Sequence, residues 1–181
     1  MGGHISRYGS HYRESGRQVG PNDRQFGCAR HGEEVGEVEL LMKIYVASSW
    51  KNQHAVEMLT HQLRLRDHEV LSFVENNHGE GPHGAKQLPF DEWVFSESGT
   101  KSFIYDTDGA RLSDLVIYIG PSGCDAWAEV GMAWASGVPV LGLWSKGEQS
   151  GLMRRCLKWF DNWKRLIEHI DEIVELRKQV A

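Results

Sequence analysis

The chain has 181 residues, of which 40% are hydrophobic, and its formal net charge is -5. This composition supports one α/β domain with an extension. It argues against nucleic acid as the main partner, and the lack of a long apolar run argues against a membrane span. Three widely spaced cysteines are typical of a reduced, cytoplasmic protein rather than of a disulfide framework.

Residues 1 to about 36 differ in composition from the rest of the chain. They are rich in Gly, Arg, Ser, His and Gln and contain almost no aliphatic residues. Such a segment cannot bury enough apolar surface to offset the entropy of ordering, so residues 1–41 are predicted to be a disordered extension. Met42 then opens a domain predicted to span residues 42–181. Cys28 and His31 have metal-ligand spacing, but no second pair follows, so a flexible tail is favoured and no metal is expected.

The first half of the domain alternates strand and helix patterns. In chain order, these patterns predict a strand at 43–48, a helix at 52–66, a strand at 69–74, a glycine-rich loop at 76–88, a short helical piece at 89–96 and a helix at 102–112. The following stretch, 115–144, reads as a strand–helix–strand unit. Leu115–Ile119 is short, apolar and β-branched, as in a strand buried on both faces. Asp125 is a suitable N-cap for the next helix, and Gly137 is a suitable C-cap. Residues 138–143 are predicted to form a second buried strand.

The C-terminal part completes the alternation. Residues 152–160 look helical, and apolar spacing over 166–176 predicts a closing amphipathic helix, with room for a short fifth strand before it. Strands alternating with helices predict a parallel sheet covered on both faces. We therefore expect an α/β fold of the flavodoxin or Rossmann type, a three-layer sandwich with a four- or five-stranded parallel sheet. The aromatic cluster Trp159, Phe160 and Trp163 suggests a subunit interface.

Four segments of the domain contain candidate catalytic or binding residues and follow one another in a defined order. They are Ile44–Trp50, with a tyrosine near a strand end, Asp106–Asp114, Ala128–Gly131 with its Glu-x-Gly, and Gly151–Met153. Together they resemble the nucleoside 2-deoxyribosyltransferase superfamily, which includes the deoxyribosyltransferases and the nucleoside 5′-monophosphate N-glycosidases. The resemblance extends from Met42 to about residue 174.

This resemblance implies three catalytic residues. Glu129 would be the nucleophile that attacks or stabilises the anomeric carbon of the sugar, as in retaining glycosidases. Tyr45 would hold that carboxylate, and Asp106 would assist the departing base. Each carboxylate also has a purely structural interpretation: Glu129 suits the helix dipole, Asp106 suits a turn, and Asp125 suits a helix cap. Asp114 is expected only to tie its segment to the next strand.

The turns near the sheet edge hold the candidate substrate-binding residues. They are Ser48, Ser49, Trp50, Lys51, Ser122, Gly123, Asp125 and Ser150. Serines and amides before a helix can cradle an anion, and Lys51 falls where the monophosphate N-glycosidases have an arginine. Gly123 stands where the transferases carry a substrate-binding Asp. Gly151 replaces the Asn that binds the 5′-hydroxyl in the transferases, which slightly favours a 5′-phosphate. Serine is also ordinary in turns. Phe90 and Trp93, like Trp50, are candidates for stacking on a base.

The sequence thus predicts an enzyme that cleaves or transfers the N-glycosidic bond of a nucleoside or nucleoside 5′-monophosphate without a cofactor. The resemblance also implies a homodimer or higher homo-oligomer, because Gly151–Met153 resembles a short segment that a neighbouring subunit of that superfamily lends to the site. Two alternatives remain open: a non-catalytic nucleotide-binding module, and an activity like that of an NAD glycohydrolase, because Toll/interleukin-receptor-like domains use a Glu on a similar frame. The fold alone does not choose among them.

Overall fold

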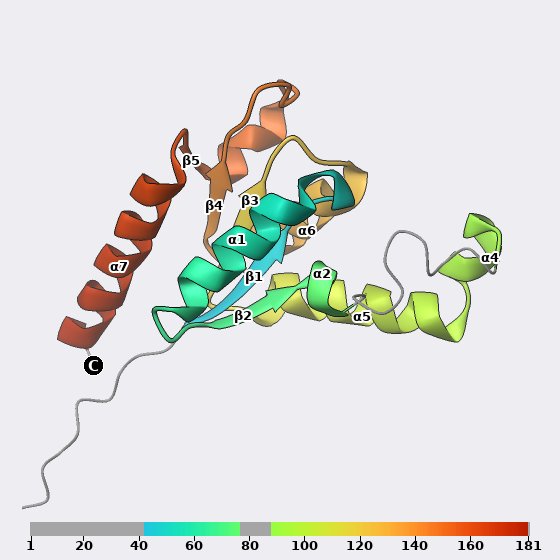
Figure 1. The fold of residues 1–181 in the computed structure, drawn as a ribbon, viewed down its shortest axis with the longest axis horizontal. Helices are drawn as coiled ribbons and strands as arrows, with labels where there is room; N and C mark the ends of the chain where they lie inside the picture. Colours follow the sequence, from blue (N-terminus) through green and yellow to red (C-terminus); the bar gives the residue numbers. More distant parts are fainter. Residues whose placement is uncertain (1–41, 77–87, 181) are drawn as a thin grey trace, which may run out of the picture. The chain divides into compact units, whose positions relative to one another are not determined.

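A five-stranded parallel sheet forms the centre of the domain, in a computed structural model that describes residues 42–76 and 88–180. The strands are β1 (Lys43–Ala47), β2 (Glu69–Ser72), β3 (Leu115–Ile119), β4 (Val140–Leu143) and β5 (Lys158–Phe160). Their order across the sheet is β2-β1-β3-β4-β5, and every neighbouring pair is parallel (Figure 1). The predicted α/β sandwich is confirmed, with five strands.

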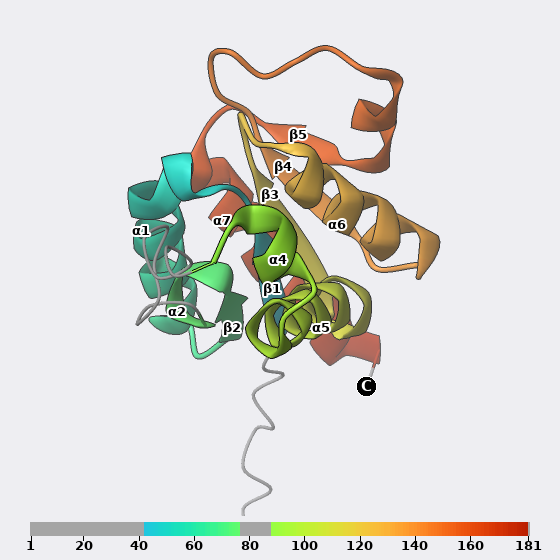
Figure 2. The same cartoon turned by 90° about the vertical axis from the view of Figure 1, so that its right-hand side faces the viewer.

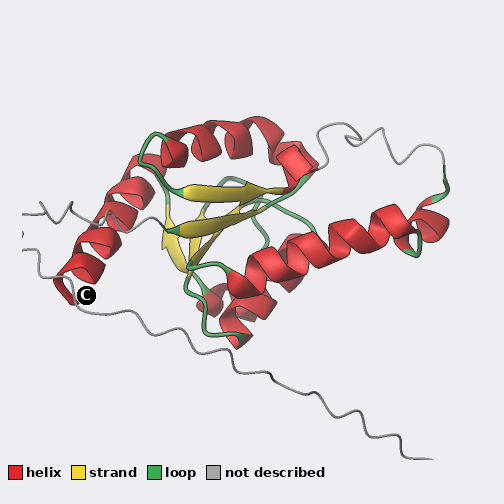
Figure 3. Cartoon of the chain, turned by 90° about the horizontal axis from the view of Figure 1, so that it is seen from below, coloured by secondary structure: helices red, strands yellow, loops and turns green. Residues whose placement is uncertain are grey.

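Helices cover both faces of this sheet (Figure 3). The long helices are α1 (Gln53–Arg64), α5 (Glu97–Leu112), α6 (Cys124–Ala135) and α7 (Trp163–Val180), and the short ones are η1 (Trp50–Asn52), α2 (Phe73–Asn76), α4 (Phe90–Val94) and η3 (Leu152–Cys156). Buried side chains of α1 and α7 pack in one hydrophobic cluster, and those of α5 and α6 pack in another. The sheet separates the two clusters.

Strand alternation decides which side chains enter which layer. Ile44 and Val46 of β1 belong to the cluster of α1 and α7, whereas Tyr45 and Ala47 belong to the cluster of α5 and α6. This follows from the period of two residues in a strand. Tyr45 is therefore directed toward α5 and α6, the two helices that carry Asp106 and Glu129.

The direction of the strand order reverses at the middle of the sheet. From β1 the chain moves outward to β2, and from β3 it moves outward in the opposite direction to β4. In open α/β sheets, ligands bind at the carboxyl ends of the strands where the order reverses. Here that point lies between β1 and β3.

Several elements differ from the sequence-based expectations. Lys158–Phe160 forms β5 rather than part of a helix, because its backbone pairs with β4. Helix α5 begins at Glu97, earlier than expected, since the Ser96 hydroxyl accepts a hydrogen bond from the Gly99 amide and caps it. The prediction that Asp125 is the N-cap of α6 was wrong, because Gly123 occupies that position and Asp125 lies in the first turn of the helix.

Other expectations lie outside the described residues. These are the N-terminal extension, Cys28, His31 and most of the glycine-rich loop, so the boundary at residue 42 remains a prediction. Within 42–76 and 88–180, no helix has the length and apolar character required to cross a membrane. Asp114 ties its segment to β1 rather than to the next strand, because its carboxylate accepts a hydrogen bond from the Lys43 amide at 2.8 Å.

Candidate active site

Three elements bring Tyr45, Asp106 and Glu129 together. The buried Tyr45 hydroxyl of β1 donates a hydrogen bond to Oδ1 of Asp106 on α5 at 3.1 Å. The same hydroxyl hydrogen-bonds to Glu129 of α6. Helices α5 and α6 lie side by side on this face of the sheet, in agreement with their extensive contacts (Figure 2). The three residues expected to be catalytic are therefore neighbours in space.

Glu129 is an unusual group for a helix that covers a sheet. Its side chain is only 9% exposed, and its Oε2 atom has no hydrogen-bond partner among the described residues. Burial, reinforced by the negative charge of Asp106, raises the pKa of Glu129 to about 9, although the hydrogen bond with Tyr45 acts in the opposite direction. Leaving an oxygen of a buried carboxyl without a partner is energetically costly, which makes Glu129 a candidate functional residue.

The pKa of Asp106 is raised less than that of Glu129. Burial raises its pKa to about 6, the hydrogen bond from Tyr45 opposes this rise, and the charge of Asp125 adds to it. At neutral pH a fraction of Asp106 therefore keeps its proton. A carboxyl with a pKa near the working pH is suited to donating a proton to a leaving group.

A cavity of about 490 Å³ opens beside these carboxylates. Its acidic members are Asp106, Asp125 and Glu129, and its other walls come from α4, α5, the turn between them and α6. Phe90 and Trp93, which the sequence analysis proposed for base stacking, line this cavity. Phe103 and Met132 also line it, although the sequence analysis did not identify them. Both missed residues lie three positions from a predicted catalytic residue on the same helix, so helical spacing would have indicated them.

The turn after β1 has a structural role that the sequence did not reveal. The Ser48 hydroxyl donates to the carbonyl oxygen of Ile119 at 2.8 Å, and the Asn52 amide donates to the carbonyl oxygens of Ile119 and Pro121 at 3.2 and 2.9 Å. These bonds tie the end of β1 to the turn after β3. The nearby hydroxyls of Ser49 and Ser122 are buried without a hydrogen-bond partner among the described residues, and neither residue lines the cavity beside Glu129.

The remaining candidates lie away from the carboxylates. The Trp50 ring packs edge-on against Phe73, with centroids 5.1 Å apart, on the side of α1 and α7. Lys51 and Ser150 are exposed. Gly123 is also exposed and has open space where a side chain would stand. None of these four residues lines the cavity beside Glu129.

Tyr118 of β3 is the centre of a second hydrogen-bonded cluster. The Tyr118 hydroxyl donates to Oε2 of Glu148 at 2.9 Å and accepts from the Ser122 amide at 3.2 Å. The Tyr118 ring packs with Trp127 and Trp159 at centroid distances of 4.9 and 5.9 Å. Trp159 is half-buried in this packing, and the subunit interface suggested for Trp159, Phe160 and Trp163 stays a prediction.

Comparison with solved structures finds several similar chains. No family model and no curated protein matches the chain. A 2-deoxyribosyltransferase from the psychrotolerant bacterium Bacillus psychrosaccharolyticus matches with a TM-score of 0.54 and 26% identity, over 68% of this chain and 89% of that one. A conserved protein from Enterococcus faecalis V583 matches with a TM-score of 0.51 and 18% identity, over 73% of this chain and 98% of that one, which supports the fold alone.

Proposed function

Because the match to a 2-deoxyribosyltransferase confirms the resemblance to the nucleoside 2-deoxyribosyltransferase superfamily, we propose that this chain cleaves or transfers the N-glycosidic bond of a nucleoside. The match supports nucleoside glycosyl transfer in general. One observation carries the finer proposal: the buried Glu129 carboxyl presents an unpartnered oxygen beside the Tyr45–Asp106 hydrogen bond.

In this proposal Glu129 acts on the sugar. Breaking the bond between the anomeric carbon and the base nitrogen passes through an oxocarbenium-like state, which an ionised carboxylate can stabilise or attack. Burial raises the pKa of Glu129 to about 9, so the free protein holds this group largely protonated at neutral pH. Positive charge developing on the sugar, together with the Tyr45 hydrogen bond, favours the ionised form.

Asp106 acts on the departing base. Its raised pKa of about 6 leaves a fraction of the carboxyl able to donate a proton or a hydrogen bond near neutral pH. Whether the glycosylated Glu129 then reacts with water or with a second base distinguishes hydrolysis from transfer. We propose the buried hydroxyls of Ser49 and Ser122 as ligands for the 5′ side of the sugar, whether it carries a hydroxyl or a phosphate.

A base-release assay tests this function. Wild-type protein and Glu129→Gln are incubated with nucleosides and their 5′-monophosphates, and free bases are separated by chromatography. We expect release by the wild type and a loss of at least about 100-fold in the variant. The exposed Glu168→Gln on α7 serves as the matched control and should retain full activity. Equal release by Glu129→Gln would overturn the mechanism.

The alternative of a non-catalytic nucleotide-binding module rests on the departures at Gly123 and Gly151, which replace substrate-binding side chains of the transferases. Both positions are exposed, with nothing within 4 Å of an added Cβ. Thermal stabilisation by a nucleotide without any base release, equal in the wild type and Glu129→Gln, would favour this alternative.

A further inference from the structure

The cavity beside Glu129 combines acidic groups with aromatic rings. Asp106, Asp125 and Glu129 line it together with the rings of Phe90, Trp93, Phe95 and Phe103, and no Lys, Arg or His is among its described lining residues. Aromatic faces attract delocalised organic cations through the negative potential of the ring, and carboxylates add a direct attraction. The composition of this cavity is therefore that of a site for an aromatic cation.

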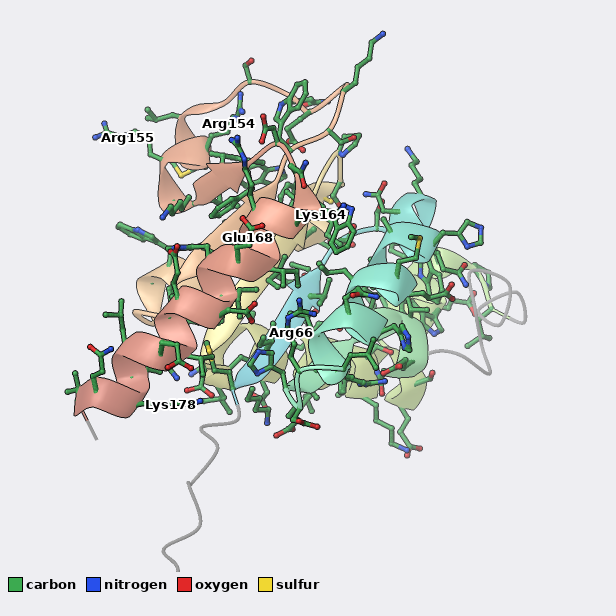
Figure 4. The ribbon with its side chains drawn as sticks, turned by 60° about the vertical axis from the view of Figure 1, so that its left-hand side comes forward. Arg66, Arg154, Arg155, Lys164, Glu168 and Lys178 are labelled. Atoms are coloured by element: carbon green, nitrogen blue, oxygen red, sulfur yellow. The ribbon has the colours of Figure 1, made fainter. Side chains whose placement is uncertain are left out.

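The carboxylates are not neutralised from within the described protein. Neither Asp106, Asp125 nor Glu129 forms an ion pair with a described Lys or Arg. The negative charges of Asp106 and Asp125 both raise the pKa of Glu129. In Figure 4 the labelled Lys164 is on α7, which covers the opposite face of the sheet. The Arg154 guanidinium lies over the Trp159 ring, 4.8 Å from its centroid.

Glu129 supplies an independent indication of a ligand. It is more than nine-tenths buried, lines the cavity, and leaves Oε2 without a partner among residues 42–76 and 88–180. A cation in the cavity would favour the ionised form of Glu129, which is largely protonated in the free protein at neutral pH, whereas a neutral ligand would not.

We propose that the cavity selects nucleosides whose base carries a positive charge, such as a pyridinium or an N7-alkylated purine. This inference rests on the proposed N-glycosidic function. The bond between the anomeric carbon and the base nitrogen breaks with both electrons going to nitrogen, so the base leaves as a neutral molecule and needs no proton. A Glu129 oxygen forms the new bond to carbon, and water then releases the sugar and one proton.

Binding of compounds without a glycosidic bond tests the cavity separately from catalysis. In calorimetry at low salt, we expect 1-methylnicotinamide, a pyridinium cation, to bind at least about tenfold more tightly than neutral nicotinamide. Asp125→Asn should remove most of this preference. Asp108→Asn is the matched control, because Asp108 lies on α5 but does not line this cavity. Equal affinity for the two compounds would overturn the inference.

Turnover gives the second measurement. The kcat/KM for N7-methylguanosine and for guanosine is divided by the uncatalysed rate of each, since the cationic nucleoside is intrinsically more labile. We expect the corrected ratio to favour N7-methylguanosine by about tenfold or more. Release from neutral nucleosides without this preference would overturn the inference and leave the proposed function standing. Tight binding of the cation without release from any nucleoside would support the cation site and overturn the proposed function.

Discussion

The Tyr45 hydroxyl has one proton and two carboxyl neighbours. It donates to Asp106 at 3.1 Å, and its hydrogen bond with Glu129 lowers the pKa of that carboxyl. Burial and the two negative charges raise the pKa of Tyr45 itself well above its usual range, so the phenol stays protonated. Tyr45 is therefore placed to stabilise whichever carboxyl is ionised.

We expect Tyr45→Phe to shift the pH dependence of catalysis. Without the hydroxyl, the pKa of Glu129 rises above about 9, and less of the enzyme carries the ionised nucleophile at a given pH. The acidic limb of kcat/KM should move to higher pH, with a loss of about 10- to 100-fold near neutrality. Base-release rates measured across the pH range test this. A lower plateau with an unmoved limb would assign Tyr45 a packing role only.

Glu129→Gln should stabilise the fold while it removes activity. The folded-state pKa of Glu129 is raised, so this residue costs nothing below its unfolded value of 4.5 and costs progressively more as the pH rises toward about 9. Glutamine has no charge to bury. Near pH 8 we expect Tm to increase by roughly 2–8 °C, with the gain vanishing near pH 4.5. A gain of equal size at both pH values would refute this explanation.

At the scale of elements, the approach of α5 to β1 builds the site. A Cβ added at Gly109 would lie 2.5 Å from the Tyr45 ring, so only glycine lets α5 pass close enough to that ring. Asp106 lies three residues earlier, on the same side of the helix. The close approach therefore brings the Asp106 carboxylate within reach of the Tyr45 hydroxyl.

We expect Gly109→Ala to separate α5 from β1. The clash should cost about 1–3 kcal/mol of stability and should lower activity more than stability predicts, because the Tyr45–Asp106 bond lengthens. Denaturant unfolding and base release measure the two effects. Gly131→Ala is the matched control: it is also inside a helix but has nothing within 4 Å of its added Cβ, so it should be neutral or stabilising. Identical behaviour of the two variants would contradict this role.

At the scale of the whole molecule, we propose that two copies of the chain associate through η3. Leu152 is 73% exposed and Met153 is 61% exposed, and both belong to the segment that resembles the one a neighbouring subunit lends to the site. Exposed apolar side chains of this kind are typical of interaction surfaces. Oligomerisation would cover them and complete the cavity of the partner.

The double variant Leu152→Ser/Met153→Ser should be monomeric and should release base at least about tenfold more slowly than the wild type. Its Tm, extrapolated to low protein concentration, should match that of the wild type. Leu65→Ser, at a residue that is 63% exposed beyond α1, is the matched control. Light scattering measures the oligomeric state. A monomeric wild type with full activity would contradict the proposal.

The local pattern of the sequence was sufficient for most of the fold. The β-branched runs and helical spacings placed β1, β3, β4, α1, α6 and α7, because burial of an apolar face is encoded every two or every three to four residues. The strand β5 was not predictable in this way. Three residues, Lys158–Phe160, carry too short a pattern, and only pairing with β4 makes them a strand.

By itself, the sequence determined the fold class and, through its resemblance, the candidates Tyr45, Asp106 and Glu129. The tertiary structure decided that these residues meet, that the Ser48 hydroxyl donates to the carbonyl of Ile119, and that aromatic side chains line the cavity beside the carboxylates. The physical reason is the range of the interactions. Periodicity reports which face of an element is buried, whereas a hydrogen bond between residues 71 positions apart depends on how the whole sheet is assembled.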